Sequence, residues 1–151
     1  MSIGEDAGEI HPMQTRRSHH RYLFYVKHHG GDHRAARWCP EISREAEFAV
    51  FDTADDLEIS DERGWLYGVG ARDADDHLPE LGTWGQQVAE FPRARPEQPW
   101  HGYPLWPLED AGPQNRRGEF ARPSKQVFRI MVERGLLTDR ERKRLTKGHH
   151  V

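Results

Sequence analysis

The sequence predicts an α+β fold with a small, mostly antiparallel sheet over about residues 21–70, an irregular Trp- and Pro-rich segment, and two C-terminal helices. Three observations predict this class. Short aromatic and β-branched runs bounded by glycine or acidic residues occur before residue 71. Five prolines fall within residues 92–107, where they prevent regular structure. The C-terminal part then shows helical periodicity with helix-start signals.

The chain of 151 residues suits a single domain, because one hydrophobic core serves about 100–200 residues. We expect a globular domain over residues 19–148 and a flexible lead-in over residues 1–18, which carry no periodic apolar pattern. No secretory signal and no run of about 18–20 apolar residues is present. Cys39 is the only cysteine. A cytoplasmic protein without a disulfide or a membrane segment is therefore expected.

Three runs are predicted as strands because β-branched and aromatic residues favour extended structure. They are residues 22–27, 47–53 and 64–70. In residues 47–53 the apolar side chains would lie on both faces of an extended chain, as in a strand buried on both sides. Residues 71–80 are predicted to form an acidic loop without core residues.

Residues 84–108 differ most from the rest of the chain in composition. Their tryptophans are Trp84, Trp100 and Trp106. We expect an extended segment that passes over the sheet, with a strand or a helical turn at residues 87–91 and no regular element beyond. Phe91, Trp84 and Trp106 are expected to supplement a core that is otherwise poor in apolar residues.

Within that segment, Trp100, His101, Gly102 and Tyr103 place a titratable imidazole between two large rings. Gly102 would let a ligand or another backbone come close, and rings held by prolines form a surface that binds at little entropic cost. We interpret His101 and Tyr103 as candidate catalytic residues and Trp100 as a candidate ligand contact. The alternative is that these rings only fill the core.

Two helices are predicted after residue 122. Ser124 is a helix-start residue, and Val127, Ile130 and Met131 form an amphipathic stripe. Gly135 is placed to end this helix in the left-handed conformation.

Thr138 and Glu141 match the capping-box pattern and predict a second helix over about residues 139–145. Two helices joined by a tight turn are similar to a helix-turn-helix, but the second is short and has few side chains suited to base recognition, so phosphate contact is the expected use.

The net charge of −3 hides strong segregation. Residues 41–80 contain 13 acids and 3 bases, whereas residues 114–151 contain 11 bases and 4 acids. Either these parts pack against each other, or the basic part meets a polyanion. Side chains four apart share a helix face. The predicted ligand-binding cations are two such pairs and two preceding arginines: Lys125 and Arg129, Arg140 and Arg144, and Arg116 and Arg117.

Several side chains offer metal-ligand chemistry without a recognised spacing. They are His19, His20, His28, His29, His33 and Cys39. Because adjacent residues on a strand point to opposite faces, no metal site and no cofactor are predicted. A looser hypothesis pairs one of these histidines with His101 for acid–base cleavage of RNA. The acidic residues of the 41–80 span lack EF-hand spacing and favour a solvated surface.

The chain contains no Walker loop, no G-x-G-x-x-G and no G-x-S-x-G. P-loop hydrolysis, Rossmann redox chemistry and α/β-hydrolase chemistry are therefore disfavoured. The predicted function is a small soluble binding module for an anionic ligand, above all nucleic acid. An alternative is an enzyme for a phosphate-containing or nucleotide substrate, with His101 as general acid or base. A second alternative is an antitoxin- or immunity-type protein that covers a basic partner with residues 41–80.

Overall fold

The computed structural model describes residues 8–11, 20–25, 37–83, 85–105 and 123–151. The fold is α+β, as predicted, with a small antiparallel sheet and two C-terminal helices. The elements are, in chain order, β1 (Gly8–His11), β2 (Tyr22–Tyr25), α2 (Arg44–Asp56), β3 (Leu66–Gly68), β4 (Ala89–Phe91), β5 (Tyr103–Pro104), α3 (Lys125–Glu133) and α4 (Asp139–Thr146).

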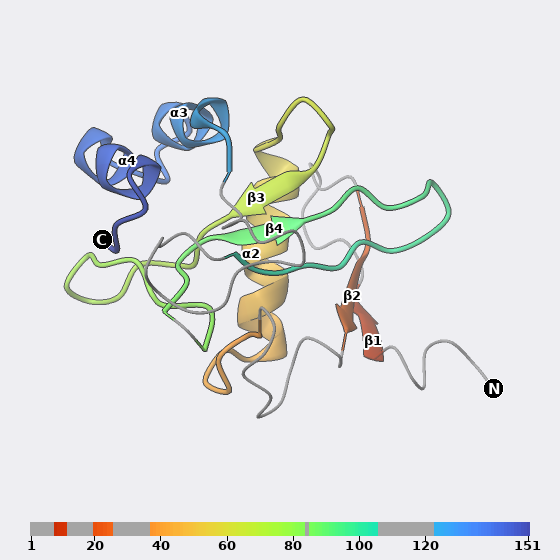
Figure 1. Ribbon diagram of the computed structural model, residues 1–151. Coiled ribbons are helices and arrows are strands. Elements are labelled where there is room, and N and C mark those ends of the chain that lie inside the picture. The colour runs from red at the N-terminus through yellow and green to blue at the C-terminus, as the bar shows by residue number, and fades with distance from the viewer. Residues whose placement is uncertain (1–7, 12–19, 26–36, 84, 106–122) are drawn as a thin grey trace.

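The central sheet has the strand order β3–β4–β5 and separates two helical layers. One layer is α2, which packs so closely that a Cβ added at Gly68 would lie 2.8 Å from Cγ1 of Val50. The other layer is α3 and α4, whose buried side chains share a hydrophobic cluster with the opposite face of the sheet. In Figure 1, α2 crosses behind β3 and β4, and α3 and α4 lie next to each other on the side away from β1 and β2.

The strand register decides which side chains face which layer. Leu66 pairs with Phe91, and both belong to the cluster on the α2 side. Tyr67 pairs with Glu90, and Glu90 pairs with Tyr103 on the next strand. Because side chains alternate along a strand, these last three form one cross-strand row on the face turned toward α3 and α4.

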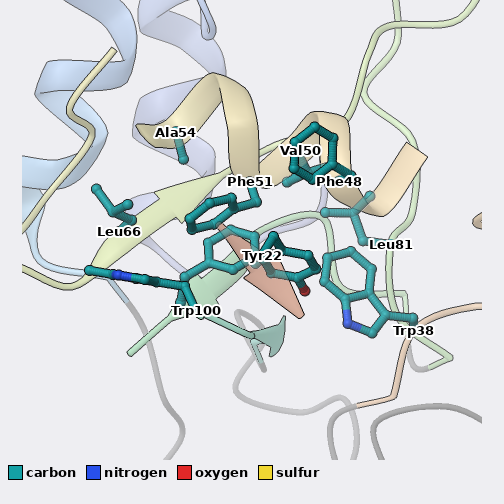
Figure 2. Close-up of a cluster of buried hydrophobic side chains, with 11 residues drawn as sticks. Tyr22, Trp38, Phe48, Val50, Phe51, Ala54, Leu66, Leu81 and Trp100 are labelled. Atoms are coloured by element: carbon teal, nitrogen blue, oxygen red, sulfur yellow. The ribbon is translucent and has the colours of Figure 1, made fainter. Parts of the chain in front are cut away.

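The core on the α2 side is built from aromatic rings (Figure 2). The ring centroid of Phe51 lies 4.8 Å from Tyr22, 5.1 Å from Phe91 and 6.0 Å from Trp100. Phe91 is therefore a core residue, as predicted. The other two tryptophans of the 84–108 segment lie outside the described residues.

The prediction of a strand at residues 47–53 is wrong, because α2 covers this run. The side chain of Ser43 caps the helix by accepting a hydrogen bond from the Ala46 amide, at 3.1 Å. The buried side chains repeat with helical spacing over the whole element: Glu47, Phe48, Val50, Phe51, Ala54 and Asp55. Residues 47–53 alone are too short to separate this 3.6-residue period from a strand with two buried faces.

Three further differences concern the strands and the acidic loop. β5 lies beyond Phe91, where the prolines were expected to exclude regular structure; it is possible because Pro104 ends a two-residue strand at the edge of the sheet. Leu78 is 5% exposed, so the 71–80 loop does contribute to the core. β1 lies within the predicted lead-in of residues 1–18 and pairs antiparallel with β2. Two strands of the central sheet, β4 and β5, therefore lie beyond residue 70, outside the range predicted for the sheet.

The C-terminal pair agrees closely with its sequence signals. Ser124 caps α3, and Gly135 follows α3 with a φ of +79°. Both hydrogen bonds of the capping box between Thr138 and Glu141 are present at the start of α4. Among the described residues, no helix is long and apolar enough to cross a bilayer.

Candidate functional site

The segment of residues 20–25 lies against α2 and against the Trp- and Pro-rich segment. The Leu23 amide donates to the Trp100 carbonyl at 2.6 Å, and the Trp100 amide donates to the Arg21 carbonyl at 2.9 Å. These bonds form a parallel bridge between Tyr22 and Trp100. Residues far apart in the sequence therefore meet at the face of α2.

His20 and Asp55 form a histidine–carboxylate pair at this junction. The backbone amide of His20 donates to Oδ2 of Asp55 at 2.8 Å, and ring atom Nδ1 of His20 lies 2.8 Å from Oδ1. The carboxylate is buried in α2, with 2% of the side chain exposed, whereas 43% of the His20 side chain is exposed. The His20 ring also packs against Trp100, with centroids 4.7 Å apart.

The chemistry of this pair follows from its hydrogen bonds. An ionised Asp55 accepts a hydrogen bond from Nδ1–H, so the lone pair of the neutral ring is on Nε2. A carboxylate in this position fixes the tautomer and the orientation of the imidazole, as in acid–base pairs of enzymes.

A second buried acid on α2 binds the same segment. The Tyr22 hydroxyl donates to Oε2 of Glu47 at 2.5 Å, and both side chains are fully buried. Burial, and then the negative charge of Glu47, raise the pKa of Tyr22 well above its usual range. Glu47 and Asp55 are two helical repeats apart and share one face of α2. Each carboxylate thus anchors one residue of the segment.

The cross-strand row on the other face of the sheet forms a third polar cluster. Glu90 accepts hydrogen bonds from Tyr67 at 2.9 Å and from Tyr103 at 2.7 Å, one on each carboxylate oxygen. Burial and then the charge of Glu90 raise the pKa of both tyrosines far above their ordinary value. The two phenols therefore stay protonated and serve as donors to a carboxylate that is 7% exposed.

Asp61 and Arg63 close this cluster at its outer end. Asp61 accepts four hydrogen bonds from Arg63 and Trp65, and the guanidinium of Arg63 lies 3.6 Å from the Trp65 ring centroid. Burial alone would raise the pKa of Asp61, but the hydrogen bonds from Arg63 and Tyr67 outweigh it and lower the pKa. The Tyr67 hydroxyl lies 2.9 Å from Asp61 and 2.9 Å from Glu90, so the two carboxylates share its one proton.

The predicted ligand-binding cations of the C-terminal helices are exposed. In α3 the buried side chains are Val127, Phe128 and Met131, and Lys125 and Arg129 lie on the opposite face. In α4 only Leu145 is buried, and the exposed cations are Arg140, Lys143, Arg144 and Lys147. Within the described part of the chain, the side chains of Lys125, Arg129 and Arg140 make no ion pair or hydrogen bond.

Two of the three acids of α3 and α4 are paired with cations, and the third, Glu133, is exposed. Asp139 pairs with Arg142 at 2.8 Å and with Lys143 at 3.3 Å. Glu141 accepts two hydrogen bonds from Arg72 of the acidic span, at 2.5 and 3.0 Å. Arg144 is also engaged, because it donates to the His150 carbonyl. The surface of the pair is therefore positive.

The other predicted site residues that the structure describes have different surroundings. His101 is partly buried, Trp100 is 5% exposed within the aromatic core, and the Tyr103 hydroxyl is bound to Glu90. Arg116 and Arg117 lie outside the described residues, as do His19, His28, His29 and His33. In the part of the chain that is described, no three His, Cys, Asp or Glu side chains are grouped as metal ligands.

Sequence reasoning missed the pairing of His20 with Asp55, which are 35 residues apart. It also treated the acids of residues 41–80 as a solvated surface. The sequence does indicate these two buried acids once residues 44–56 are recognised as a helix, because Glu47 and Asp55 then lie on its apolar face. A charged residue on such a face is buried only when it is paired.

Fold and sites together define a small α+β protein with acids buried under its aromatic segment, one half-exposed histidine–aspartate pair, and a positively charged helix pair at the C-terminus. A comparison with protein-family models found no match, and comparisons with curated proteins and with solved structures found none either. The function of the protein is therefore inferred from the chemistry of these residues.

Proposed function

We propose that the protein binds nucleic acid through phosphate contacts made by α3 and α4. The observation that carries this proposal is the set of exposed side chains of Lys125, Arg129 and Arg140, which have no partner among the described residues. Because Asp139 and Glu141 are neutralised by other side chains, these cations present a net positive field. Such a field attracts phosphates regardless of base sequence.

The charge segregation of the chain supports the same ligand. Only two ion pairs between described residues connect the 41–80 span with the helix pair and its C-terminal extension, those of Arg72 with Glu141 and of His150 with Glu80. In the first of these pairs the acidic span supplies the base, so the contact removes a negative charge from the helix pair. The basic surface is thus not consumed by internal pairing with the acidic span in that part of the chain.

The test is binding of a fluorescently labelled oligonucleotide, followed by anisotropy over a range of salt concentrations. The wild-type affinity should fall steeply with salt, with a slope of about −0.9 per phosphate neutralised on duplex DNA. The double variant Arg129→Glu/Arg140→Glu should bind at least about ten-fold more weakly and reduce that slope by about 2.

A matched control carries the same change in net charge elsewhere. Arg93 and Arg95 are exposed in the segment between β4 and β5, so Arg93→Glu/Arg95→Glu should retain most of the affinity. A salt-independent interaction would contradict the proposal. Equal losses in the two double variants would mean that overall charge, rather than α3 and α4, determines binding.

A further inference from the structure

We propose that Gln87 and the return segment, residues 148–151, position the guanidinium of Arg144 as a fixed phosphate contact on α4. Arg144 would bind the same ligand as the exposed cations of α3 and α4, so this role rests on the proposed function and deepens it. Gln87 is a positioning residue, because it contacts the return segment and not the phosphate.

The return segment begins where α4 ends. Gly148 follows the C-cap Lys147 and has a φ of +78°. The Gly148 amide donates to the Leu145 carbonyl, and the His149 amide donates to the Arg144 carbonyl, both at 2.9 Å. This is the Schellman pattern, in which a left-handed glycine ends a helix and changes the direction of the chain. In Figure 1 the segment leaves α4 and runs to the point marked C.

Gln87 holds the far end of the return segment. Gln87 is 1% exposed, and its Nε2 donates to the Leu78 carbonyl at 3.1 Å and to the backbone oxygen of Val151 at 2.6 Å. Its Oε1 accepts a hydrogen bond from the Val151 amide at 2.9 Å. Because a carbonyl only accepts, Leu78 must face Nε2, and the orientation of the carboxamide is fixed. Gln87 therefore binds the backbone of Val151 through both of its polar groups.

The segment held by Gln87 carries the carbonyl that binds Arg144. Nε and Nη2 of Arg144 donate to the His150 carbonyl at 3.3 and 3.0 Å. The imidazole of His150 also lies 3.2 Å from Oε1 of Glu80. Among the described residues, the remaining N–H groups of Arg144 have no partner. They lie on Nη1 and Nη2, whose fork matches two oxygens of one phosphate.

The contact with His150 orients Arg144 without cancelling its charge, because a carbonyl is neutral. A long side chain loses rotamer freedom when it binds a ligand, and this loss weakens the affinity. Arg144 has lost part of that freedom in the folded protein already. Phosphate binding by Arg144 therefore costs less entropy than binding by an arginine without a partner.

Arg144 is the middle member of a row of cations on α4. Arg140 precedes it by four residues and Lys147 follows it by three, so the three side chains share one helix face, and all three residues are exposed. At about 1.5 Å per residue the row extends about 10 Å along the helix. One strand of duplex DNA rises about the same distance over about three nucleotides. The row therefore fits successive phosphates of one strand.

The test is a double-mutant cycle between Gln87 and Arg144, measured with the full chain as oligonucleotide affinity by fluorescence anisotropy. Gln87→Met loses both bonds to Val151, so the affinity should fall about two- to ten-fold, the cost of ordering one long side chain. In the Arg144→Lys background the same change should have no effect, because an ammonium has no fork to orient. A displaced α4 would instead lower the affinity equally in both backgrounds. Gln98→Met is the matched control, since Gln98 is exposed, and it should retain the affinity.

A second measurement needs no nucleic acid. In ¹H–¹⁵N NMR spectra, the Nε–H proton of Arg144 should exchange with water more slowly in wild type than in Gln87→Met, whereas exchange at Arg140, which has no partner among the described residues, should stay the same. Val151→Gly should act in the same direction as Gln87→Met. It removes only a partly buried side chain, so it serves if Gln87→Met does not fold.

The outcomes separate the two proposals. Equal losses of affinity in both backgrounds, or unchanged exchange at Arg144, would overturn the positioning role and leave nucleic-acid binding by α3 and α4 intact. A wild type without salt-dependent binding would overturn the proposed function, and this role of Arg144 with it.

Discussion

Tyr67, Glu90 and Tyr103 illustrate at the scale of single residues how a buried charge is accommodated. The two phenols donate to different oxygens of the same carboxylate, so neither acceptor is left unsatisfied in an apolar surrounding. The register places all three residues in one row across three strands. The same principle holds for Tyr22 with Glu47 beneath the aromatic segment. Tyrosine hydroxyls are thus the donors for two of the buried acids.

These tyrosines predict a delayed alkaline titration. The folded pKa values of Tyr22, Tyr67 and Tyr103 are raised, chiefly by burial. The stability linked to them is therefore complete below their unfolded pKa of about 10 and is lost as the pH rises toward the folded values. Absorbance at 295 nm should show that at least three of the four tyrosines ionise only when the protein unfolds. Three tyrosines that titrate near pH 10 while the circular dichroism is native would contradict this.

At the scale of elements, Gly135 and Gly102 show two different reasons why a position requires glycine. One reason is backbone conformation, and the other is close packing. Gly135 has a φ of +79° and open space around its Cα, with no heavy atom within 4 Å of an added Cβ. Gly102 has no positive φ, but an added Cβ would overlap the Phe91 ring and the Glu90 carbonyl. The first glycine is needed for its backbone conformation, and the second for the close contact between β4 and the residue that precedes β5.

The two alanine variants should therefore differ in magnitude. Gly135→Ala should lower the free energy of unfolding by about 1–2 kcal/mol, the cost of a left-handed residue with a side chain. Gly102→Ala should cost more, because Phe91 and the strand backbone must shift in a packed core. Urea unfolding of both variants checks the order. A larger loss at Gly135 would show that its backbone conformation, rather than core packing, is the stronger constraint.

At the scale of the whole molecule, Arg72 connects the acidic loop with the helix pair. Its guanidinium donates to Glu141, to the Leu136 carbonyl and to the Asp76 carbonyl. This one side chain satisfies a carbonyl of the α3–α4 turn and holds the capping glutamate of α4. The hydrogen bonds from Arg72 are the first cause of the lowered pKa of Glu141.

Arg72→Ala should destabilise the protein in a pH-dependent way. A carboxyl whose folded pKa is lowered contributes stability above its unfolded pKa, and that contribution is lost as the pH falls through the folded value. At pH 7 we expect a loss of about 1–3 kcal/mol, because partly buried hydrogen bonds to a charged group are broken. The difference from wild type in urea unfolding should shrink as the pH falls below about 4. A difference that does not depend on pH would contradict the role of Glu141.

Arg72→Ala also tests whether the contact between the acidic loop and α4 affects nucleic-acid binding. Without Arg72, the charge of Glu141 is no longer neutralised on α4. Nucleic-acid affinity should then decrease even though Arg72 itself is outside the helix pair. Glu141→Gln should retain the affinity, because it removes that charge, and this control distinguishes an electrostatic effect from a loss of fold.

The sequence by itself determined the elements whose signals are local. Ser124, Gly135 and the Thr138–Glu141 capping box define α3 and α4 through contacts between near neighbours in the chain. The aromatic strand at Tyr22–Tyr25 and the glycine-flanked strand at Leu66–Gly68 were also predicted. The exposed cations of the helix pair followed from helical periodicity alone, and the structure exposes them on both helices.

Only the tertiary structure decided which polar residues meet. The helical state of residues 47–53 depends on a face that is buried between the sheet and residues 20–25, and a short window does not contain that information. His20 reaches Asp55, and Tyr103 reaches Glu90, only after the chain has brought separate segments together. Side chains that bond to distant partners leave no periodic trace in the sequence, because the free energy that pairs them arises from burial, which forms only with the complete core.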